Sequence, residues 1–260
     1  MQSNNSVFHS PLVLRLHVDR TLVEHDEFAL PEGAARHAQV RRVQPGDALR
    51  LFDGRGHEHA AQVLEMGRKA VVVRLGPACA ALPELPQRIT LALGMPANER
   101  MDTLVEKATE LGVHAIQPLE CERSVLRLSG ERAQRKREHW QAVAVAASEQ
   151  CGRAWVPGVA PVQNLLPWLQ ALAAQPQAPA GECRWLLSFS ADAQAPGARL
   201  QSMNTPPAAL RVLSGPEGGL SLAEEEAARA AGFQPVSLGP RVLRADTAPL
   251  ALLAWWGLRG

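Results

Sequence analysis

Tyrosine is absent from this 260-residue chain, and lysine is rare: only Lys69, Lys107 and Lys136 occur among 27 basic residues. The basic side chains are thus mostly arginines, whose planar guanidinium can bind a phosphate through two hydrogen bonds, although biased codon usage would give the same ratio. Because the formal net charge is only +1, the chain is no polycation, and any nucleic-acid site has to be a local patch.

Cysteine is scarce, and no two cysteines form a CxxC pair; the four are Cys79, Cys121, Cys151 and Cys183. This spacing lacks the usual zinc motifs and is typical of free thiols in a reducing cytoplasm, so we expect no metal. The first residues lack the charged start and apolar block of a signal peptide, and no apolar run approaches the roughly 20 residues needed to cross a bilayer. We therefore expect a soluble, cytoplasmic protein without a membrane partner.

Several nucleotide and hydrolase signatures are also missing. The chain has no G-x-G-x-x-G after a strand, no G-x-x-x-x-G-K-[ST] and no G-x-S-x-G. These absences disfavour a Rossmann dinucleotide site, a P-loop and a serine hydrolase elbow. His57-Glu58-His59 resembles a metal-binding pair, but no further ligand is near it in sequence, so a solvated hairpin is the better interpretation.

Residues 12–75 contain short apolar runs separated by turn residues. Strands this short and this regularly spaced indicate a small barrel, so residues 1–80 are predicted to form a β-barrel domain. The predicted strands are Leu12–Val18, Ala48–Phe52, Ala60–Leu64 and Ala70–Leu75, with one helix at Gly33–Val43.

Residues 76–87 are rich in proline and weakly patterned, which predicts a linker. Beyond it, strand patterns alternate with helix patterns, as in a parallel sheet covered on both faces, so residues 88–260 are predicted to form an α/β domain. Residues 172–184 are of low complexity and are best explained as a surface insertion. The predicted strands are Arg88–Leu93, Val113–Pro118, Trp185–Phe189, Leu210–Ser214 and Pro235–Leu238, and helices are expected at Glu99–Leu111, at Glu131–Glu149 and after each of the last two strands.

The strongest local signal begins at Leu210. A strand runs into Gly215-Pro-Glu-Gly-Gly219, and Ser221 and Glu224 then have the S-x-x-E spacing of a capping box, which predicts a helix that ends near Gly232. Glycines at the C-terminal end of a parallel strand let a ligand approach the backbone closely, although a plain tight turn would have the same sequence. Glu217 argues against a phosphate ligand, because its charge would repel one.

A second glycine-bearing loop follows the next strand. Gly239-Pro240 predicts a turn, and Arg241 and Arg244 lie three residues apart. Asp246 or Thr247 can cap the last helix. Two such loops at adjacent strand ends would frame one pocket, so we predict that the ligand-binding and catalytic end of an enzyme lies within residues 210–258.

These motifs resemble those of the bacterial 16S ribosomal RNA uridine N3-methyltransferases, a family of the SPOUT superfamily. The resemblance rests on Leu213–Ser221 and on Leu238–Arg244, followed by an acidic residue and Thr-Ala. One motif alone would be weak evidence, but several in order along nearly the whole chain are specific. The others are His37, Gly46-Asp47, Leu51–Gly54, Glu106–Val113, Glu122–Ser124 and Glu149–Arg153.

The resemblance implies a PUA-like barrel that helps to bind RNA, followed by an α/β methyltransferase domain with a deep trefoil knot. It also implies a homodimer, with the site close to the subunit interface. The reaction it implies is methylation of N3 of uridine 1498 in 16S rRNA of the small ribosomal subunit, with S-adenosylmethionine as methyl donor. Two alternatives stay open: a knotted methyltransferase that acts on tRNA or on ribose 2′-OH, and a non-catalytic RNA-binding module.

For the cofactor, loop backbone groups can read the adenine edge, and an acidic side chain suits the cationic sulfonium. The expected cofactor-binding residues are Leu213, Gly215, Pro216, Glu217, Gly218, Gly219, Leu238, Gly239, Val242 and Leu243, with Phe189 from a third strand end. The expected catalytic residues are Arg244, Asp246, Arg241 and Glu217. The two arginines would stabilise the anion that develops on the uracil oxygens, and Asp246 is the candidate acceptor of the N3 proton. Helix capping by Asp246 and phosphate binding by the arginines are the simpler alternatives.

RNA contacts are expected from Arg36, His37, Arg41 and Arg42 in the first domain and from Arg123 in the second. Arg123 begins a basic stretch that ends at Arg137, for which a solvated helix face is an equally good explanation. Two positions depart from the family pattern. Arg41 stands where the family usually has leucine, and Asp246 stands where it has glutamate, which shortens that side chain by one methylene.

Overall fold

The computed structural model describes residues 13–97, 99–174, 181–203 and 205–259. The chain forms two compact units: Met1–Pro83 with Ser148–Trp155, and Glu84–Ala147 with Val156–Gly260. The start of the chain, on which the signal-peptide argument rests, and the middle of the 172–184 insertion lie outside the described residues. Within the described ranges, no helix combines the length and the apolar character needed to cross a membrane.

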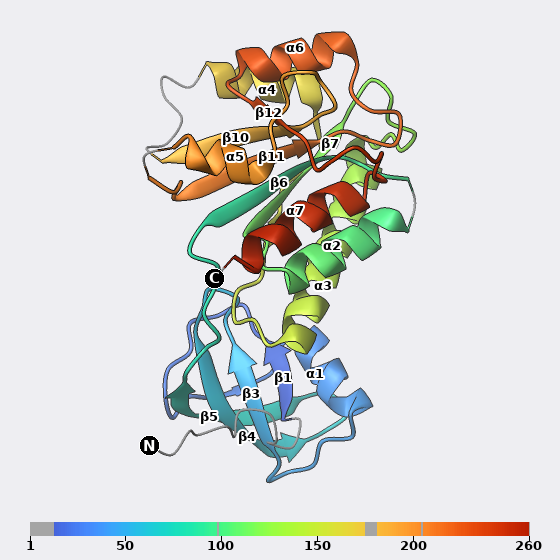
Figure 1. The fold of residues 1–260 in the computed structure, drawn as a ribbon. Coiled ribbons are helices and arrows are strands. Elements are labelled where there is room, and N and C mark those ends of the chain that lie inside the picture. The colour runs from blue at the N-terminus through green and yellow to red at the C-terminus, as the bar shows by residue number, and fades with distance from the viewer. Residues whose placement is uncertain (1–12, 98, 175–180, 204, 260) are drawn as a thin grey trace, which may run out of the picture. The chain divides into compact units, whose positions relative to one another are not determined.

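The first unit contains a five-stranded sheet and one helix (Figure 1). Its strands follow the order β1-β3-β4-β5-β2; β1 and β3 are parallel, and the other neighbours are antiparallel. As predicted, this part of the chain is rich in strands, but β2 was not predicted, and residues 76–79 of the predicted linker continue β5. The elements are β1 (Leu14–His17), β2 (Glu27–Ala29), α1 (Glu32–Val40), β3 (Ala48–Phe52), β4 (Glu58–Met66) and β5 (Val71–Cys79).

The core of the first unit follows from the two-residue period of its strands. Leu49 and Leu51 alternate with more exposed neighbours on β3, and Val71 and Val73 do the same on β5. The alanines of α1 pack against the same apolar cluster. This small core has a second, charged support, which comes from far along the chain.

Residues 148–155 provide that support. The Arg15 guanidinium donates hydrogen bonds to three carbonyls of this segment over 2.8–3.1 Å and forms a salt bridge with buried Glu58 at 2.8 Å. The Glu149 carboxylate contacts the His37 ring at 3.0 Å. Because both carboxylates are largely shielded from water, each needs such a partner. The segment is thus part of the first unit, although 64 residues separate Pro83 from Ser148 in sequence, a relation that no local pattern indicates.

The second unit is an α/β fold with a parallel sheet, as predicted. The strands follow the order β12-β10-β11-β6-β7-β8, with β9 paired to β7, and every pair is parallel. Its elements are β6 (Arg88–Gly94), α2 (Arg100–Glu110), β7 (Ala115–Glu120), α3 (Gly130–Cys151), β8 (Gly158–Val159), β9 (Gln163–Asn164), α4 (Leu165–Ala173), β10 (Glu182–Leu187), α5 (Pro196–Gln201), β11 (Ala209–Ser214), α6 (Leu222–Ala230), β12 (Gln234–Val236) and α7 (Thr247–Gly257).

Helices cover both faces of this sheet, α4 and α6 on one and α2, α3 and α7 on the other (Figure 1). Successive residues of β11 point to opposite faces: Val212 joins the apolar cluster that contains Trp140 of α3, and Leu213 joins the one that contains Trp168 of α4. Burial on both faces explains why apolar residues such as Val212 and Leu213 follow one another in β11. It also leaves only the strand ends free to form a site.

The predicted capping box of α6 is confirmed. The Ser221 hydroxyl accepts from the Glu224 N–H at 3.4 Å, and the Glu224 carboxylate accepts from the Ser221 N–H at 2.9 Å. The other carboxylate oxygen accepts from the Glu122 N–H at 2.7 Å, so Glu224 also ties α6 to the segment after β7. By contrast, α4 and α5 were not predicted, and the strand predicted to end at Phe189 ends at Leu187.

Candidate active site

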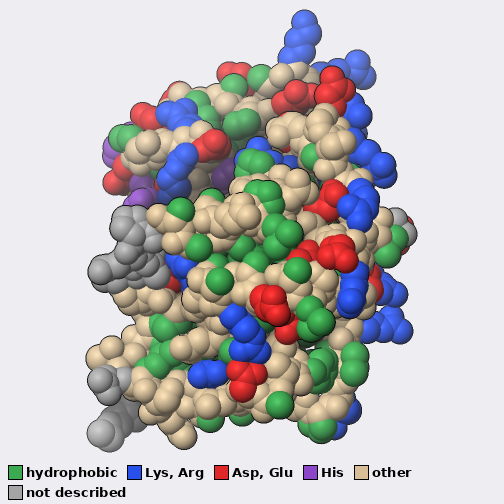
Figure 2. All heavy atoms as spheres, turned by 90° about the horizontal axis from the view of Figure 1, so that it is seen from above, with side chains coloured by type: hydrophobic (Ala, Val, Ile, Leu, Met, Phe, Trp, Pro, Cys, Tyr) green, Lys and Arg blue, Asp and Glu red, His purple; other side chains and the backbone are tan. Residues whose placement is uncertain are grey.

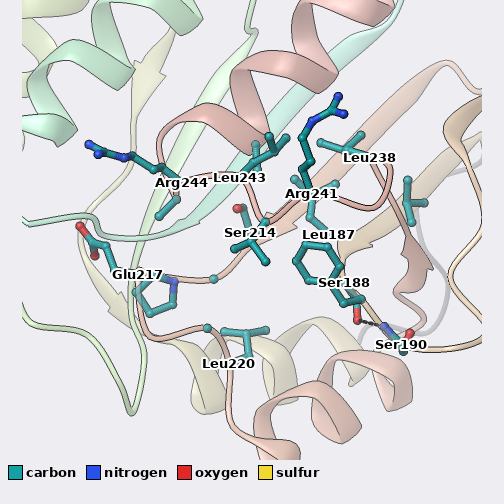
Figure 3. Close-up of a pocket in the computed structure, with 18 of the residues that line it drawn as sticks. Leu187, Ser188, Ser190, Ser214, Glu217, Leu220, Leu238, Arg241, Leu243 and Arg244 are labelled. Carbon is teal, nitrogen blue, oxygen red and sulfur yellow. Dashed lines mark hydrogen bonds between the residues drawn. The ribbon is translucent and has the colours of Figure 1, made fainter.

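Three neighbouring strands, β10, β11 and β12, end at the same edge of the sheet because they are parallel. The loops that follow them enclose a cavity of about 530 Å³ (Figure 3). This volume lies within the range of small-molecule sites in proteins. In Figure 3, Glu217 and Arg244 lie at one side of the cavity and Ser188 and Ser190 at the other, with Ser214 between them.

Most of the residues predicted from the two glycine-bearing loops line this cavity. They are Gly215, Pro216, Glu217, Gly219, Leu238, Gly239, Arg241, Val242, Leu243 and Arg244, and Phe189 lines it from the loop after β10. Leu213 does not, because it lies fully buried in the sheet one residue before the strand ends. Gly218 lies outside the lining and packs against Arg123: a Cβ at Gly218 would be 2.9 Å from the Arg123 Cβ.

Other lining residues were missed by sequence reasoning. They are Leu187, Ser188, Ser190, Ser214, Leu220, Glu225, Val236, Ala245 and Ala248. A serine or a leucine at a strand end has no local signature, so only the convergence of the three loops identifies these positions. Glu225 is the only charged residue among them. A half-buried carboxylate in a cavity wall implies a polar or cationic ligand.

The Gly215–Gly219 loop is held from two sides. The Glu217 carboxylate accepts from the Ala97 N–H at 3.0 Å and pairs with Arg100 at 3.4 Å, which ties the loop to the segment between β6 and α2. Arg123 donates to the carbonyls of Gly218 and Leu220 at 3.2 and 3.3 Å. Arg123, expected as an RNA contact, therefore braces this loop, while its exposure leaves it within reach of solvent and ligands.

An ion pair anchors the loop after β10. Arg229 of α6 donates to both carboxylate oxygens of Asp192 and to the Ser190 hydroxyl, at 2.7–2.9 Å. These hydrogen bonds hold the pKa of Asp192 well below its usual range, with Arg229 as the largest cause. The Ser188 hydroxyl accepts from the Ser190 N–H at 3.1 Å and closes the turn. The loop that carries Ser188 and Ser190 is thus held in place by α6, the helix that also carries Glu225.

The third loop, which follows β12, carries the cationic side chains. Arg241 and Arg244 are exposed, and within the described residues neither guanidinium has a hydrogen-bond or salt-bridge partner. The Arg244 carbonyl accepts from the N–H groups of Thr247 and Ala248 at 3.0 Å each, which starts α7. Both guanidiniums are therefore free to bind an anionic or oxygen-rich ligand at the cavity.

Asp246 is not part of this cavity. It is the N-cap residue of α7, but its side chain makes no capping hydrogen bond, so the predicted capping role of that carboxylate is wrong. Instead it lines a separate, mainly apolar cavity of about 440 Å³ between α2 and α7, together with Lys107 and Glu110. Asp246 is thus separated from the cavity that holds Arg241 and Arg244.

The cations predicted to contact RNA in the first unit lie on α1 and the turn after it. Arg36, Arg41 and Arg42 are exposed, whereas His37 is half-buried against Glu149. Arg42 has a φ of 57°, the left-handed region that few non-glycine residues occupy. Figure 2 shows Lys and Arg side chains interspersed with Asp and Glu side chains on the surface that it draws.

The described residues contain no cluster of three His, Cys, Asp or Glu side chains that could hold a metal ion. His57 instead contacts the buried Asp53 carboxylate at 2.8 Å, while Glu58 is buried at the start of β4. Burial by itself would raise the pKa of Asp53, but hydrogen bonds from the Arg55 N–H and from His57 outweigh it, and the pKa is lowered. Only His57 of the triplet is largely exposed, so the interpretation as a solvated hairpin holds for that residue alone.

Comparison with known proteins extends these findings. The RNA methyltransferase domain family matches residues 83–257, and the RNA methyltransferase PUA domain family matches residues 30–76. The chain is 37% identical over 216 residues to the ribosomal RNA small subunit methyltransferase E of Synechocystis, covering 83% of this chain and 67% of that protein.

Two solved structures are similar over nearly their whole length. A ribosomal RNA small subunit methyltransferase E from Neisseria gonorrhoeae, bound to S-adenosylmethionine, is 34% identical, with a TM-score of 0.84 and coverage of 94% of this chain and 96% of that one. A methyltransferase from Legionella pneumophila, also in complex with S-adenosylmethionine, is 29% identical, with a TM-score of 0.83 and the same coverage.

Proposed function

The chain belongs to the RNA methyltransferase family, and within it to the ribosomal RNA small subunit methyltransferases E; on this premise we propose that it methylates N3 of uridine 1498 in 16S rRNA. The methyl donor is S-adenosylmethionine, which two similar structures contain. The single observation that carries the proposal is the cavity at the ends of β10, β11 and β12, since it joins a donor-sized space to two unpaired arginines.

The residues of the cavity fit S-adenosylmethionine. Leu187, Leu220, Leu238 and Leu243 offer apolar surface to an adenine ring, and the glycines of the second loop expose backbone groups to its edge. Glu217 and Glu225 place two carboxylates in the wall, which suits a ligand that carries a sulfonium and an ammonium. When bound, S-adenosylmethionine supplies an electrophilic methyl group.

The protein's own part in the reaction is alignment and charge stabilisation. Uracil N3 becomes nucleophilic when it loses its proton, and the negative charge then spreads to the two carbonyl oxygens that flank N3. Arg241 and Arg244 have free guanidiniums at the cavity and would donate hydrogen bonds to those oxygens, which favours the anion. Holding the anion in line with the methyl group supplies the remaining acceleration.

The N3 proton has no carboxylate acceptor among the unengaged groups of the third loop. Asp246 faces the separate cavity between α2 and α7, and Glu217 is held by Ala97 and Arg100. We therefore propose that a water molecule at the opening of the cavity accepts the N3 proton, and that the two arginines favour its loss by stabilising the anion. Asp246 is proposed to act through the turn that carries Arg244, whose carbonyl caps the start of α7.

We further propose that the loops of the second unit are threaded as a deep trefoil knot. After β12 at one edge of the sheet, the chain returns to α7, which packs against β11 and α2, so residues 237–246 have to cross the ends of β10 and β11. The crossing supports this threading. The five-stranded sheet of the first unit is proposed to close into a PUA-like barrel that holds RNA through Arg36, His37, Arg41 and Arg42.

The same proposal includes a homodimer. The half-buried Leu250, Ala251 and Ala254 of α7 line the apolar cavity next to α2, and a second copy would cover them. The protein would act in the cytoplasm, on the small ribosomal subunit, as a step of ribosome biogenesis.

Labelled S-adenosylmethionine and small subunits that lack the methyl mark test the function directly. The expected result is one label per subunit, recovered as N3-methyluridine after digestion to nucleosides. Leu258→Ala serves as a matched control, since Leu258 is 87% exposed and lies outside the cavity. A 2′-O-methyl nucleoside, label in tRNA only, or unlabelled rRNA despite bound donor would each refute the proposed reaction.

A further inference from the structure

Phe189 is an unusual surface residue for this chain. It is 63% exposed, and it is the one phenylalanine or tryptophan in the exposed class among the described residues. The other phenylalanine and tryptophan side chains that the structure describes are buried or half-buried, several of them completely, such as Trp140 and Trp185. A single exposed apolar side chain is common on protein surfaces, but Phe189 lines a cavity together with Val242, which is also exposed, and this combination points to a ligand.

The residues around Phe189 indicate what kind of ligand it binds. Phe189 lines the cavity from the loop after β10, and the loop after the neighbouring strand β12 adds Arg241 and Val242 to the lining, the latter 84% exposed. Figure 3 shows the Arg241 side chain extending away from Glu217. We call Phe189, Arg241, Val242 and Arg244 the mouth of the cavity; it combines one aromatic ring, one aliphatic side chain and two guanidiniums.

We propose that this mouth binds a single-stranded stretch of RNA, with the phenyl ring of Phe189 stacked on the uracil that is to be methylated. The inference rests on the proposed function and adds a residue that positions the base. A uridine has to leave its base stack before N3 can reach the methyl donor, and an aromatic platform replaces part of the stacking that it loses. The arginines supply the cations that single-stranded RNA requires beside such a platform.

The alternative ligand for Phe189 is the adenine of the methyl donor, the role expected from sequence. The interior already offers Leu187, Leu220 and Leu238 to an adenine, and each of these side chains is at most half-exposed. Phe189 lies on the more exposed rim, where a ligand that arrives after the donor would meet it. The other charged residues of the mouth, Arg241 and Arg244, are cationic and favour the nucleic acid, while Glu217 and Glu225 line the wall of the donor cavity.

The test compares Phe189→Ala, Phe189→Trp and the control Leu258→Ala. The affinity of each for S-adenosylmethionine is measured by calorimetry, and the affinity for a uridine decamer is measured in the presence of S-adenosylhomocysteine. We expect Phe189→Ala to bind S-adenosylmethionine within about twofold of the unchanged protein and to bind the decamer about 10-fold more weakly, as loss of one stacked base predicts. Phe189→Trp should restore decamer binding, because a larger ring can stack in its place.

Kinetics on unmethylated small subunits gives a second readout. Phe189→Ala should lower kcat/KM for the subunit about 10-fold, and Phe189→Trp should recover most of it, which a merely structural residue would not do. If Phe189→Ala weakens S-adenosylmethionine binding as much as RNA binding, the ring belongs to the donor site and the inference is wrong. Unchanged RNA affinity in Phe189→Ala also overturns it.

Failure of the proposed function has a different signature. If the unchanged protein transfers no methyl group to small subunits, the reaction is wrong, whereas the decamer measurement still decides whether Phe189 contacts RNA. If the unchanged protein methylates N3 and Phe189→Ala does so equally well, only the inference about Phe189 fails.

Discussion

A methyl group added at Gly94 should disturb the cofactor cavity from behind. Gly94 is the last residue of β6 and lies next to the Gly215–Gly219 loop. A Cβ added at Gly94 would be 2.5 Å from both Cδ and N of Pro216 and 2.9 Å from Sγ of Cys121. Ordinary contact begins at 3.4 Å, so Pro216 has to retreat by about 0.9 Å if β6 does not move. Pro216 is backbone-constrained and lines the cavity, so the loop cannot avoid the shift by rotating a side chain.

The magnitude follows from the cost of overpacking. Extra methyl groups in packed interiors cost about 1–3 kcal/mol. If the strain is relieved by displacing the loop, the affinity of Gly94→Ala for S-adenosylmethionine should fall about 5- to 150-fold, since about 1.4 kcal/mol is a factor of ten. If the loop is not displaced, the strain remains in the folded protein and lowers its free energy of unfolding, which is measured as a lower melting temperature. Gly158→Ala in β8 is the matched control, because a Cβ there meets nothing within 4 Å.

Calorimetric titration with S-adenosylmethionine and thermal unfolding of the same two variants separate these cases. We expect Gly158→Ala to behave like the unchanged protein in both assays. The reasoning is refuted if Gly94→Ala binds S-adenosylmethionine with unchanged affinity and melts at an unchanged temperature, since the contact with Pro216 would then impose no strain.

Three further predictions concern charged residues. Arg244→Ala should abolish methyl transfer while changing the free energy of unfolding by less than about 0.5 kcal/mol, because its side chain is exposed and has no partner among the described residues; an active variant excludes Arg244 from the mechanism. Arg42→Gly should keep or slightly raise the melting temperature, since glycine tolerates the φ of 57°, and should reduce the salt dependence of RNA binding by about one phosphate contact; an unchanged salt slope argues against an RNA contact. Asp53→Asn should destabilise the first unit by about 1–2 kcal/mol at pH 7, because the Asp53 carboxylate accepts hydrogen bonds from the N–H groups of Arg55 and His57 and contacts the His57 ring, and a neutral amide accepts such bonds more weakly. The pKa of Asp53 is lowered from its ordinary value of 3.8, so this difference should be complete above that pH and shrink as the pH falls below it; a difference that persists unchanged at pH 2 contradicts the assignment.

Local chemistry was enough to find the two glycine-bearing loops and the helix that follows the first of them. Ser221 and Glu224 are three residues apart, so their reciprocal hydrogen bonds depend on the first turn of α6 and on nothing distant. Similarly, Gly239 and Pro240 mark a turn in any context. The alternation of strand and helix patterns after residue 87 also predicted a parallel sheet with both faces covered.

Where the prediction was incomplete, the missing information was non-local. The serines and Glu225 in the cavity wall have ordinary sequence surroundings. The serines become neighbours because β10 and β11 pair in register, and Glu225 joins them because Arg229 ties α6 to the loop after β10. The position of Asp246 could not be predicted for the same reason. It is two residues from Arg244 in sequence, but it lines the cavity between α2 and α7, because α7 begins directly after it.

The sequence by itself therefore determined the alternation of strands and helices, the glycine-bearing turns, and the scarcity of thiols and lysines, since each of these depends on residue type and on neighbours within a few positions. Only the tertiary structure decided which side chains share the cavity, that Ser148–Trp155 packs with the first unit, and that Gly94 supports Pro216. These relations depend on the order of strands in a sheet and on contacts between segments remote in sequence. They are set by the burial of both sheet faces together, not by any single stretch of the chain.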